Sequence, residues 1–212
     1  MRFDTEAASA RDIYNLLIGL VTPRPIALVT SMNKEGVINA APFSAYNYLC
    51  TDPPIVGLGV TNRPEEPSVP KDTARNIRRT GEFVVNVVTE HLAQQMNICA
   101  TDFPADLSEI EMAKLETTPS EVVKVPRIAS AYAALECREH TTLEIGRSRI
   151  ILGRVVSIYV EDRFVDPAGP YILSKEMHTV GRMNGLGNYV RTRDAFFEIP
   201  RIPYSEWKKK HE

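Results

Sequence analysis

A cation, a hydroxyl and an amide lie close together at the start of one predicted helix. The segment is Lys71-Asp72-Thr73-Ala74-Arg75-Asn76-Ile77. The start of a helix offers backbone N–H groups without partners and the positive end of the helix dipole. Together with Lys71, Thr73 and Asn76, these groups would suit a phosphate. The competing interpretation is an ordinary helix capped by Asp72, whose carboxylate would oppose an anion unless it is paired or turned away.

A second candidate segment combines small residues with a central proline. It reads Asn39-Ala40-Ala41-Pro42-Phe43-Ser44-Ala45-Tyr46. Because Pro42 has no N–H to donate to a strand ladder, we expect this strand to lie at an edge of the sheet or to contain a bulge. An edge leaves backbone N–H and C=O groups that could pair with a planar heterocycle. The alternative is a plain edge strand with a bulge.

Two arginines are candidates for contact with a flat ligand. Arg24 lies between Pro23 and Pro25, which stiffen its backbone and fix its direction. Arg182 and Tyr189 lie in a glycine-rich segment and could place a cation or a ring against a cofactor. The competing interpretations are a surface arginine and a flexible loop with a core tyrosine.

Other common catalytic and binding motifs are missing from the sequence. Gly57-Leu58-Gly59 and Gly185-Leu186-Gly187 lack the third glycine and the long following helix of a dinucleotide-binding loop. The sequence contains neither a phosphate-binding P-loop nor a G-x-S-x-G nucleophile elbow. Cys137 and His140 are three residues apart, but no second pair completes a zinc site.

The composition is that of an ordinary globular protein. The chain has 212 residues, of which 43% are hydrophobic and 25% charged, and its net charge is −2. This balance does not indicate nucleic acid or an anionic membrane as a partner. Three widely spaced cysteines fit a reducing compartment better than a disulfide framework. With no apolar signal core and no membrane-length segment, a cytoplasmic location is expected.

The elements that must position these candidates are mostly short strands. Residues 100–127 form a long polar excursion of the kind that often lies over a site or a subunit contact, and the chain beyond residue 166 is mostly irregular. The remaining pattern predicts helices over 9–20 (capped by Ser9), 71–79 and 90–99, and strands over 26–31, 37–46, 55–61, 83–88, 130–138, 141–145 and 149–160.

Strands follow one another directly more often than they alternate with helices. This pattern favours a mainly β fold, either an antiparallel sheet or a closed barrel with added helices. The sequence contains no repeat and no linker that would divide it, so residues 1–212 are expected to form one domain. The helix over 9–20 would be peripheral, and residues from about 200 to 212, with the basic run Lys208-Lys209-Lys210, would form a solvated tail.

Taken together, several segments resemble one protein family in their order and spacing. They are Pro23-Arg24-Pro25-Ile26-Ala27-Leu28-Val29-Thr30, Asn39-Ala40-Ala41-Pro42-Phe43-Ser44, Asp52-Pro53-Pro54, Lys71-Asp72-Thr73 with Asn76-Ile77, Gly81-Glu82-Phe83-Val84-Val85-Asn86, and Gly181-Arg182 with Tyr189. The family is the flavin reductase-like proteins with an FMN-binding split barrel, and the nearest branch is the flavoredoxin-like one. The resemblance runs from about residue 12 to residue 190.

The resemblance implies a Greek-key split β-barrel, usually a homodimer, with FMN bound near the subunit interface. It implies that Lys71, Thr73 and Asn76 hold the phosphate. It also implies that Arg24 and Thr30 lie at the same pocket, and that Arg182 and Tyr189 cover the ring from this subunit or the other. The residues that would line the isoalloxazine and the ribityl chain are Asn39, Ala41, Pro42, Phe43, Ser44 and Asn47.

The function implied is NAD(P)H-dependent reduction of flavin, with electrons passed to free flavin or to another acceptor. The isoalloxazine carries this chemistry, so no catalytic side chain or metal is required. Backbone N–H groups of residues 42–47 would stabilise negative charge on the reduced ring. Three alternatives remain open: a flavoredoxin-like electron-transfer protein with a protein partner, a non-catalytic FMN-binding module, and a barrel that binds no flavin.

Overall fold

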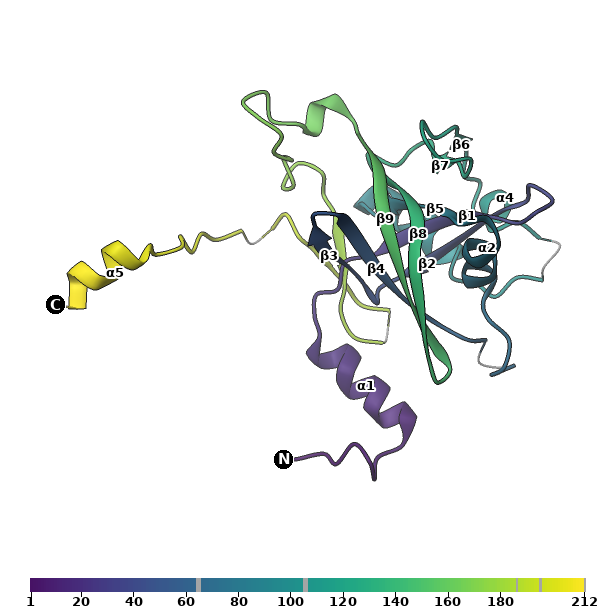
Figure 1. Cartoon of the computed structure of the whole chain (residues 1–212), viewed down its shortest axis with the longest axis horizontal. Coiled ribbons are helices and arrows are strands. Elements are labelled where there is room, and N and C mark those ends of the chain that lie inside the picture. The colour runs from purple at the N-terminus through teal and green to yellow at the C-terminus, as the bar shows by residue number, and fades with distance from the viewer. Residues whose placement is uncertain (64–65, 105–106, 186, 195, 212) are drawn as a thin grey trace.

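The main sheet of the protein contains seven antiparallel strands (Figure 1). The computed structural model describes residues 1–63, 66–104, 107–185, 187–194 and 196–211. Two short strand pairs lie outside the main sheet, β6 (Thr117–Thr118) with β7 (Arg127–Ile128) and β10 (Val180–Arg182) with β11 (Tyr189–Arg191). In chain order, the main strands are β1 (Ala27–Met32), β2 (Ile38–Phe43), β3 (Tyr46–Thr51), β4 (Pro54–Thr61), β5 (Glu82–Val87), β8 (Ala133–Ile145) and β9 (Ser148–Val160).

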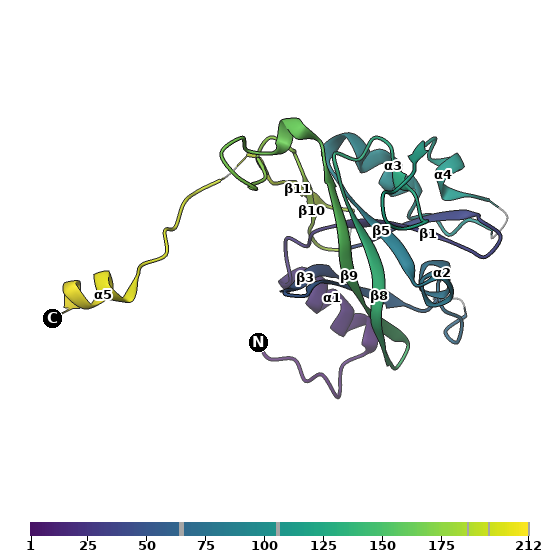
Figure 2. The ribbon, with the colours of Figure 1, turned by 45° about the horizontal axis from the view of Figure 1, so that its top comes forward.

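The chain also contains five short helices, and all but the last lie beside the sheet in the described part of the structure (Figure 2). They are α1 (Ala10–Leu20), α2 (Asp72–Thr80), α3 (Ala93–Ile98), α4 (Glu109–Met112) and α5 (Tyr204–His211), with 3₁₀ turns at Glu90–Leu92 and Asp162–Phe164. As predicted, Ser9 caps α1, since its Oγ accepts a hydrogen bond from the Asp12 N–H at 3.1 Å. Helix α5 lies away from the sheet at the end of an extended segment (Figures 1 and 2). Within the described residues, no helix is long and apolar enough to cross a membrane.

The order of the strands requires the sheet to curl. It runs β2-β1-β5-β8-β9-β4-β3, so β2 and β3 lie at opposite ends. Only residues 44 and 45 connect these two end strands. Such a short connection can join the two edges only if the sheet bends until they meet, as in a barrel. The connection is fastened to β4 by a hydrogen bond from the Gly59 N–H to the Ala45 carbonyl oxygen at 2.6 Å.

Alternate residues of the central strand β1 pack in two different hydrophobic clusters of the core. On β1, Leu28 packs in one hydrophobic cluster with Met96 of α3, while the adjacent Val29 packs in another with Ile77 of α2 and Phe83 of β5. This alternation follows from the two-residue period of a strand. Helix α2 is thereby held against one side of the sheet, with its first turn beside β2.

The fold is mainly β, as the sequence predicted, and β2 is an edge strand. Two expectations about elements were wrong. The strand predicted over 37–46 is two strands that end and begin around residues 44–45. The strands predicted over 130–138 and 141–145 are one strand, β8, with a register shift between Glu139 and Thr141. The region beyond residue 166 is mostly irregular, as expected, and its described residues also contain the short elements β10, β11 and α5.

Some predicted features fall partly outside the described residues. These are positions 105–106 of the long excursion, Leu186 of the glycine-rich segment, and Glu212 at the end of the tail.

Candidate functional site

A pocket of about 220 Å³ lies where β2 passes the first turn of α2, and we call it pocket one. Predicted site residues contribute much of its wall: Asn39, Ala41, Pro42, Phe43, Lys71 and Thr73. The opposite wall comes from residues 99–103, at the start of the long excursion. The first residues of the excursion therefore lie beside this candidate site.

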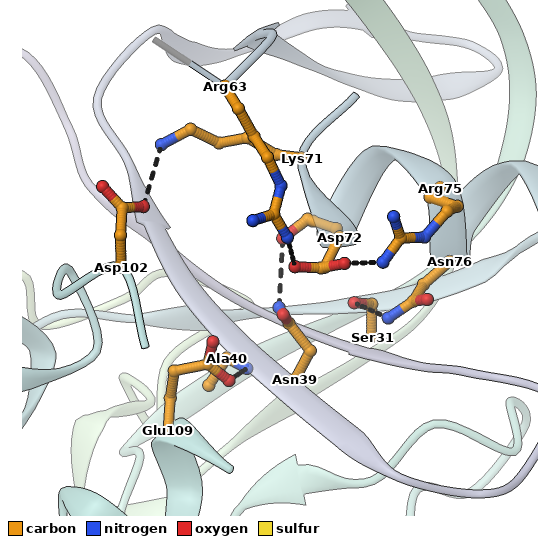
Figure 3. Close-up of polar contacts among 11 residues, drawn as sticks. Ser31, Asn39, Ala40, Arg63, Lys71, Asp72, Arg75, Asn76, Asp102 and Glu109 are labelled. Atoms are coloured by element: carbon orange, nitrogen blue, oxygen red, sulfur yellow. Dashed lines mark hydrogen bonds and ion pairs between the residues drawn. The ribbon is translucent and has the colours of Figure 1, made fainter. Parts of the chain in front are cut away.

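The first turn of α2 combines an uncapped helix start with nearby cationic side chains (Figure 3). Lys71 is the N-cap residue, and no side chain of the described residues caps the helix. Asp72 is the first helical residue and not the cap that one interpretation predicted. Its carboxylate is paired with the guanidinium groups of Arg63 and Arg75. The charge that would have opposed an anion is thus compensated.

Three side chains of pocket one retain donor capacity. The hydroxyl of Thr73, which is 1% exposed, accepts a hydrogen bond from the Asn39 amide at 3.1 Å, so its own proton remains to be donated. Lys71 Nζ lies 4.0 Å from Asp102 Oδ1, a loose contact at the surface. The Nε of Arg63 is buried and has no hydrogen-bond partner among the described residues. A phosphate would satisfy these donors and the free N–H groups of the helix start.

A second pocket, pocket two, of about 210 Å³, shares Pro42, Phe43 and Ala100 with pocket one. The predicted residues Arg24, Ser44, Arg182 and Tyr189 line it. Tyr14, Met96, Asn97 and Asn184 also line it, and the sequence analysis did not identify them.

The hairpin of β10 and β11 places the aromatic and cationic groups of pocket two. Arg182 and Tyr189 are directly paired across the hairpin, with the guanidinium carbon 4.6 Å from the ring centroid. Two backbone hydrogen bonds, of 2.8 and 2.9 Å, join Arg182 to Arg24. Both arginines therefore reach the pocket from one chain.

Arg24 has a structural task beside its place in pocket two. Arg24 is 9% exposed, and its Nη1 donates to the carbonyl oxygens of Ile18 at 2.6 Å and Val21 at 2.9 Å. Its Nε donates to Ser44 Oγ at 3.3 Å. The guanidinium therefore holds the C-terminal end of α1 against the connection between β2 and β3.

Three predicted site residues line neither pocket one nor pocket two. Thr30 is fully buried, and its hydroxyl donates to the Pro126 carbonyl oxygen at 2.7 Å. Asn47 is exposed on β3, and its Oδ1 accepts from the Tyr48 N–H. Asn76 is 4% exposed, and its amide donates to Ser31 Oγ at 3.3 Å, one turn along α2 from Lys71 and Thr73.

Residues 99–103, Arg63 and Glu109 of pocket one were not predicted as site residues, and the last two depend on tertiary contacts. Arg63 lies in the proline-rich loop before α2. The sequence feature that could have identified it is a cation close to a helix start. Glu109 comes from α4; its carboxylate accepts from the Ala40 N–H at 3.2 Å, and burial raises its pKa. Across the described residues, no group of three or more His, Cys, Asp and Glu side chains is placed to hold a metal ion.

The two pockets together suit an elongated ligand. One end offers cations, a hydroxyl and a helix start for a phosphate, and the other offers an arginine and aromatic rings for a planar group.

Comparison with known proteins gives matches over nearly the whole chain. The family model described as "Flavin reductase like domain" matches residues 19–178. Among solved structures, nitrilotriacetate monooxygenase component B from Bacillus cereus is 32% identical, with a TM-score of 0.88 over 94% of this chain and 98% of that chain. The 2-nitrobenzoate 2-nitroreductase NbaA from Pseudomonas fluorescens is 35% identical, with a TM-score of 0.85 over 96% and 98%.

A third structure identifies the fold. It is a putative flavin reductase with a split barrel domain from Shewanella frigidimarina, 21% identical, with a TM-score of 0.78 over 96% of this chain and 99% of that chain. The split-barrel fold expected from the sequence is confirmed.

Proposed function

Because this chain belongs to the flavin reductase-like domain family, we propose that it binds FMN and acts as an oxidoreductase with NAD(P)H as electron donor. The observation that carries the proposal is the junction of pockets one and two at Pro42 and Phe43. A candidate phosphate site and a candidate site for a planar ring meet there along a strand edge, and this arrangement would suit FMN.

The donors of pocket one support FMN as the cofactor. Lys71 and Thr73, with the start of α2, would hold the phosphate, and the unpaired Nε of Arg63 would gain a partner. Asn76 is directed to Ser31, so we assign it no phosphate contact.

Pocket two supports binding of the isoalloxazine. Pro42 and Phe43 would form one wall, and Arg182 would place a positive charge near the ring. When bound, FMN would supply the hydride and electron transfer. The chain would orient the ring and exclude water from it, and its fixed cation would favour the more negative reduced form.

The test of the proposal is an FMN titration of the protein and of Lys71→Ala and Thr73→Ala. Each substitution should weaken FMN binding by roughly 1.5–3 kcal/mol, about ten- to a hundredfold, because a charge-assisted contact is lost. Lys175→Ala is the matched control, since Lys175 is exposed and lies outside both pockets. If both pocket variants bind FMN as tightly as the parent protein, the phosphate assignment is wrong.

The electron donor separates the reductase from the flavoredoxin-like alternative. Rapid oxidation of NADH or NADPH with added free FMN would support a flavin reductase. Tight retention of FMN after desalting, with slow NAD(P)H oxidation, would support an electron carrier that is reduced by a protein partner.

Pocket two also supports a second candidate, the direct reduction of an aromatic acid. Arg182 could bind a carboxylate, and Tyr14 and Tyr189 could contact a ring. The 35% identical neighbour is named as a 2-nitrobenzoate 2-nitroreductase. In this case 2-nitrobenzoate should stimulate NADPH or NADH oxidation at saturating FMN, and Arg182→Gln should raise its KM. Oxidation that does not respond to the acid would exclude this candidate.

Exposed apolar side chains support a homodimer. Leu17 and Leu20 of α1 are 55% and 78% exposed, and Tyr48 and Leu49 of β3 are 69% and 53% exposed. An isolated subunit would leave these large side chains in water at a cost. Light scattering after size exclusion should give twice the chain mass of 23.7 kDa. A monomer at micromolar concentration would contradict the proposal.

A further inference from the structure

A carboxylate lies at the wall of pocket one beside the groups assigned to the phosphate. Glu109, the first residue of α4, lines the same pocket as Lys71 and Thr73. Its Oε2 accepts a hydrogen bond from the Ala40 N–H at 3.2 Å (Figure 3), and no side chain of the described residues bonds its other oxygen, Oε1. The side chain is half-buried, so an acceptor oxygen remains available to a molecule in the pocket.

The open edge of β2 fixes the position of this carboxylate. Because β2 is an end strand, alternate N–H and C=O groups along it have no neighbouring strand to pair with. The start of α4 bonds two of them. Ser108 Oγ donates to the Ile38 carbonyl oxygen at 3.2 Å, and Glu109 accepts from Ala40. Turning the carboxylate away from an arriving anion would break this second bond.

The charged groups around Glu109 offer a dianion little net attraction. Among the described residues, three cations and three carboxylates line pocket one or pair with its lining residues: Arg63, Lys71 and Arg75, and Asp72, Asp102 and Glu109. An adjoining pocket of about 350 Å³, which Glu109 also lines, adds one group of each sign, Arg79 and Glu35. With Glu109 ionised, these formal charges cancel, and a phosphate dianion would add two negative charges.

The other elements packed against Glu109 do not supply a compensating charge. Strand β2 has no charged side chain. At the end of α3, the Sγ of Cys99 donates to the Glu109 carbonyl oxygen at 3.8 Å, and burial raises the pKa of this thiol to about 12, so it stays neutral. The excess negative charge of a bound phosphate must therefore be reduced at Glu109 or at the phosphate itself.

Burial already favours the protonated form of Glu109. It raises the pKa of the carboxyl group, and hydrogen bonds from the backbone N–H groups of Glu109 and Ala40 oppose this effect only in part. A phosphate monoester releases its second proton at about pH 6. Two anionic oxygens in one pocket repel each other, but a single proton between them converts the repulsion into a charge-assisted hydrogen bond.

We propose that Glu109 makes pocket one specific for phosphate by sharing one proton with the bound phosphate group. The inference rests on the proposed binding of FMN and adds how its phosphate is recognised. One proton is taken from solvent on binding, and it forms a hydrogen bond between Glu109 Oε1 and a phosphate oxygen. Sulfate carries no proton near neutral pH, so the ionised carboxylate repels it.

The first test is an FMN titration of the parent protein from about pH 7 to about pH 9. Where free FMN and the free protein have both released this proton, the complex retains it, so binding weakens as the pH rises. The dissociation constant should increase about tenfold for each pH unit. Calorimetry in buffers of different ionisation enthalpy should show uptake of about one proton for each FMN bound.

The variant Glu109→Gln identifies the group that shares the proton. Its amide oxygen can still accept from the Ala40 N–H, but the side chain cannot take up a proton. FMN affinity should then vary little over this pH range, and at its upper end the variant should bind FMN more tightly than the parent. Glu111→Gln is the matched control, since Glu111 is exposed on the same helix and lines neither pocket one nor pocket two. It should keep the pH dependence of the parent.

Competition by inorganic anions tests the specificity without any flavin chemistry. At about pH 7.5 and constant ionic strength, inorganic phosphate still carries a proton and should displace FMN from the parent protein. Sulfate should require at least about a tenfold higher concentration. In Glu109→Gln, sulfate should compete nearly as well as phosphate.

Three results would overturn the inference while leaving FMN binding intact. They are an FMN affinity that does not change with pH, a pH dependence that persists in Glu109→Gln, and equal competition by sulfate and phosphate in the parent protein. Absence of FMN binding at every pH would instead reject the proposed function together with this inference.

Discussion

Glu136 is a buried carboxylate that secures the long excursion to the sheet. It is 1% exposed and accepts hydrogen bonds from the backbone N–H groups of Glu121, Val122 and Val123 at 2.7 to 3.1 Å. In Glu136→Gln the new amide group would face one of these donors. We expect the free energy of unfolding to fall by about 2–3 kcal/mol, measured by urea denaturation. Glu121→Gln, at an exposed position, is the control and should have little effect.

Buried thiols and a buried phenol predict lower stability at alkaline pH. Burial raises the pKa of Cys99 and of Tyr46 to about 12, and raises that of Cys137 further. In the unfolded chain, thiols ionise near pH 8.5 and tyrosine near pH 10. Between about pH 9 and pH 12 the folded state therefore binds more protons, and the free energy of unfolding falls as the pH rises.

Urea denaturation at pH 8 and at about pH 10.5 measures this effect. The loss of stability should be smaller in Cys99→Ala, because this variant lacks one of the buried groups that ionise on unfolding. Equal stability at the two pH values would show that these groups titrate alike in both states.

At the residue scale, the sequence identified groups whose role depends on local structure. The place of Lys71 and Thr73 at a helix start could be predicted because local sequence signals define that start. Arg63 could not, because it reaches pocket one through a loop whose path the local pattern does not determine. The prolines around Arg24 predicted a fixed direction, but the carbonyl groups of α1 that it binds became evident only from the fold.

At the element scale, α1 depends on Arg24 for its attachment. None of the described side chains of α1 is buried, and the Arg24 guanidinium binds two carbonyl groups at its C-terminal end. Arg24→Gln should free the helix at a cost of about 1–3 kcal/mol to its docking. Limited chymotrypsin digestion should then cut within residues 10–21 earlier than in the parent protein. Arg11→Gln, on the exposed side of α1, should digest at the parent rate; if Arg24→Gln does so too, the attachment lies elsewhere.

Element types were easier to predict than element ends. The pattern of residues 37–46 correctly predicted an extended edge, but it contained no sign that the chain leaves one end of the sheet at residue 43 and joins the other at residue 46. That step depends on sheet curvature, which is a property of all seven strands. Likewise, the irregularity between Glu139 and Thr141 was interpreted as a break, whereas β9 continues alongside and keeps β8 whole.

At the scale of the whole molecule, closure of the sheet depends on a glycine. A Cβ atom on Gly59 would lie 2.8 Å from the Cβ of Ala45, in the connection between the two end strands. Gly59→Ala should lower the free energy of unfolding by about 1–3 kcal/mol through overpacking. Ala45→Gly in the same chain should recover part of this loss. Gly19→Ala, where the added Cβ meets no atom within 4 Å, is the control and should not destabilise.

The two-residue connection between β2 and β3 has a consequence for the lifetime of the folded state. The Ala45 carbonyl oxygen holds this connection to β4, and the neighbouring residues Pro42, Phe43 and Ser44 line pocket two. A molecule that binds pocket two only while the connection is in place stabilises the closed sheet against local opening. Amide hydrogens of β2 and β3 should therefore exchange more slowly as occupancy rises.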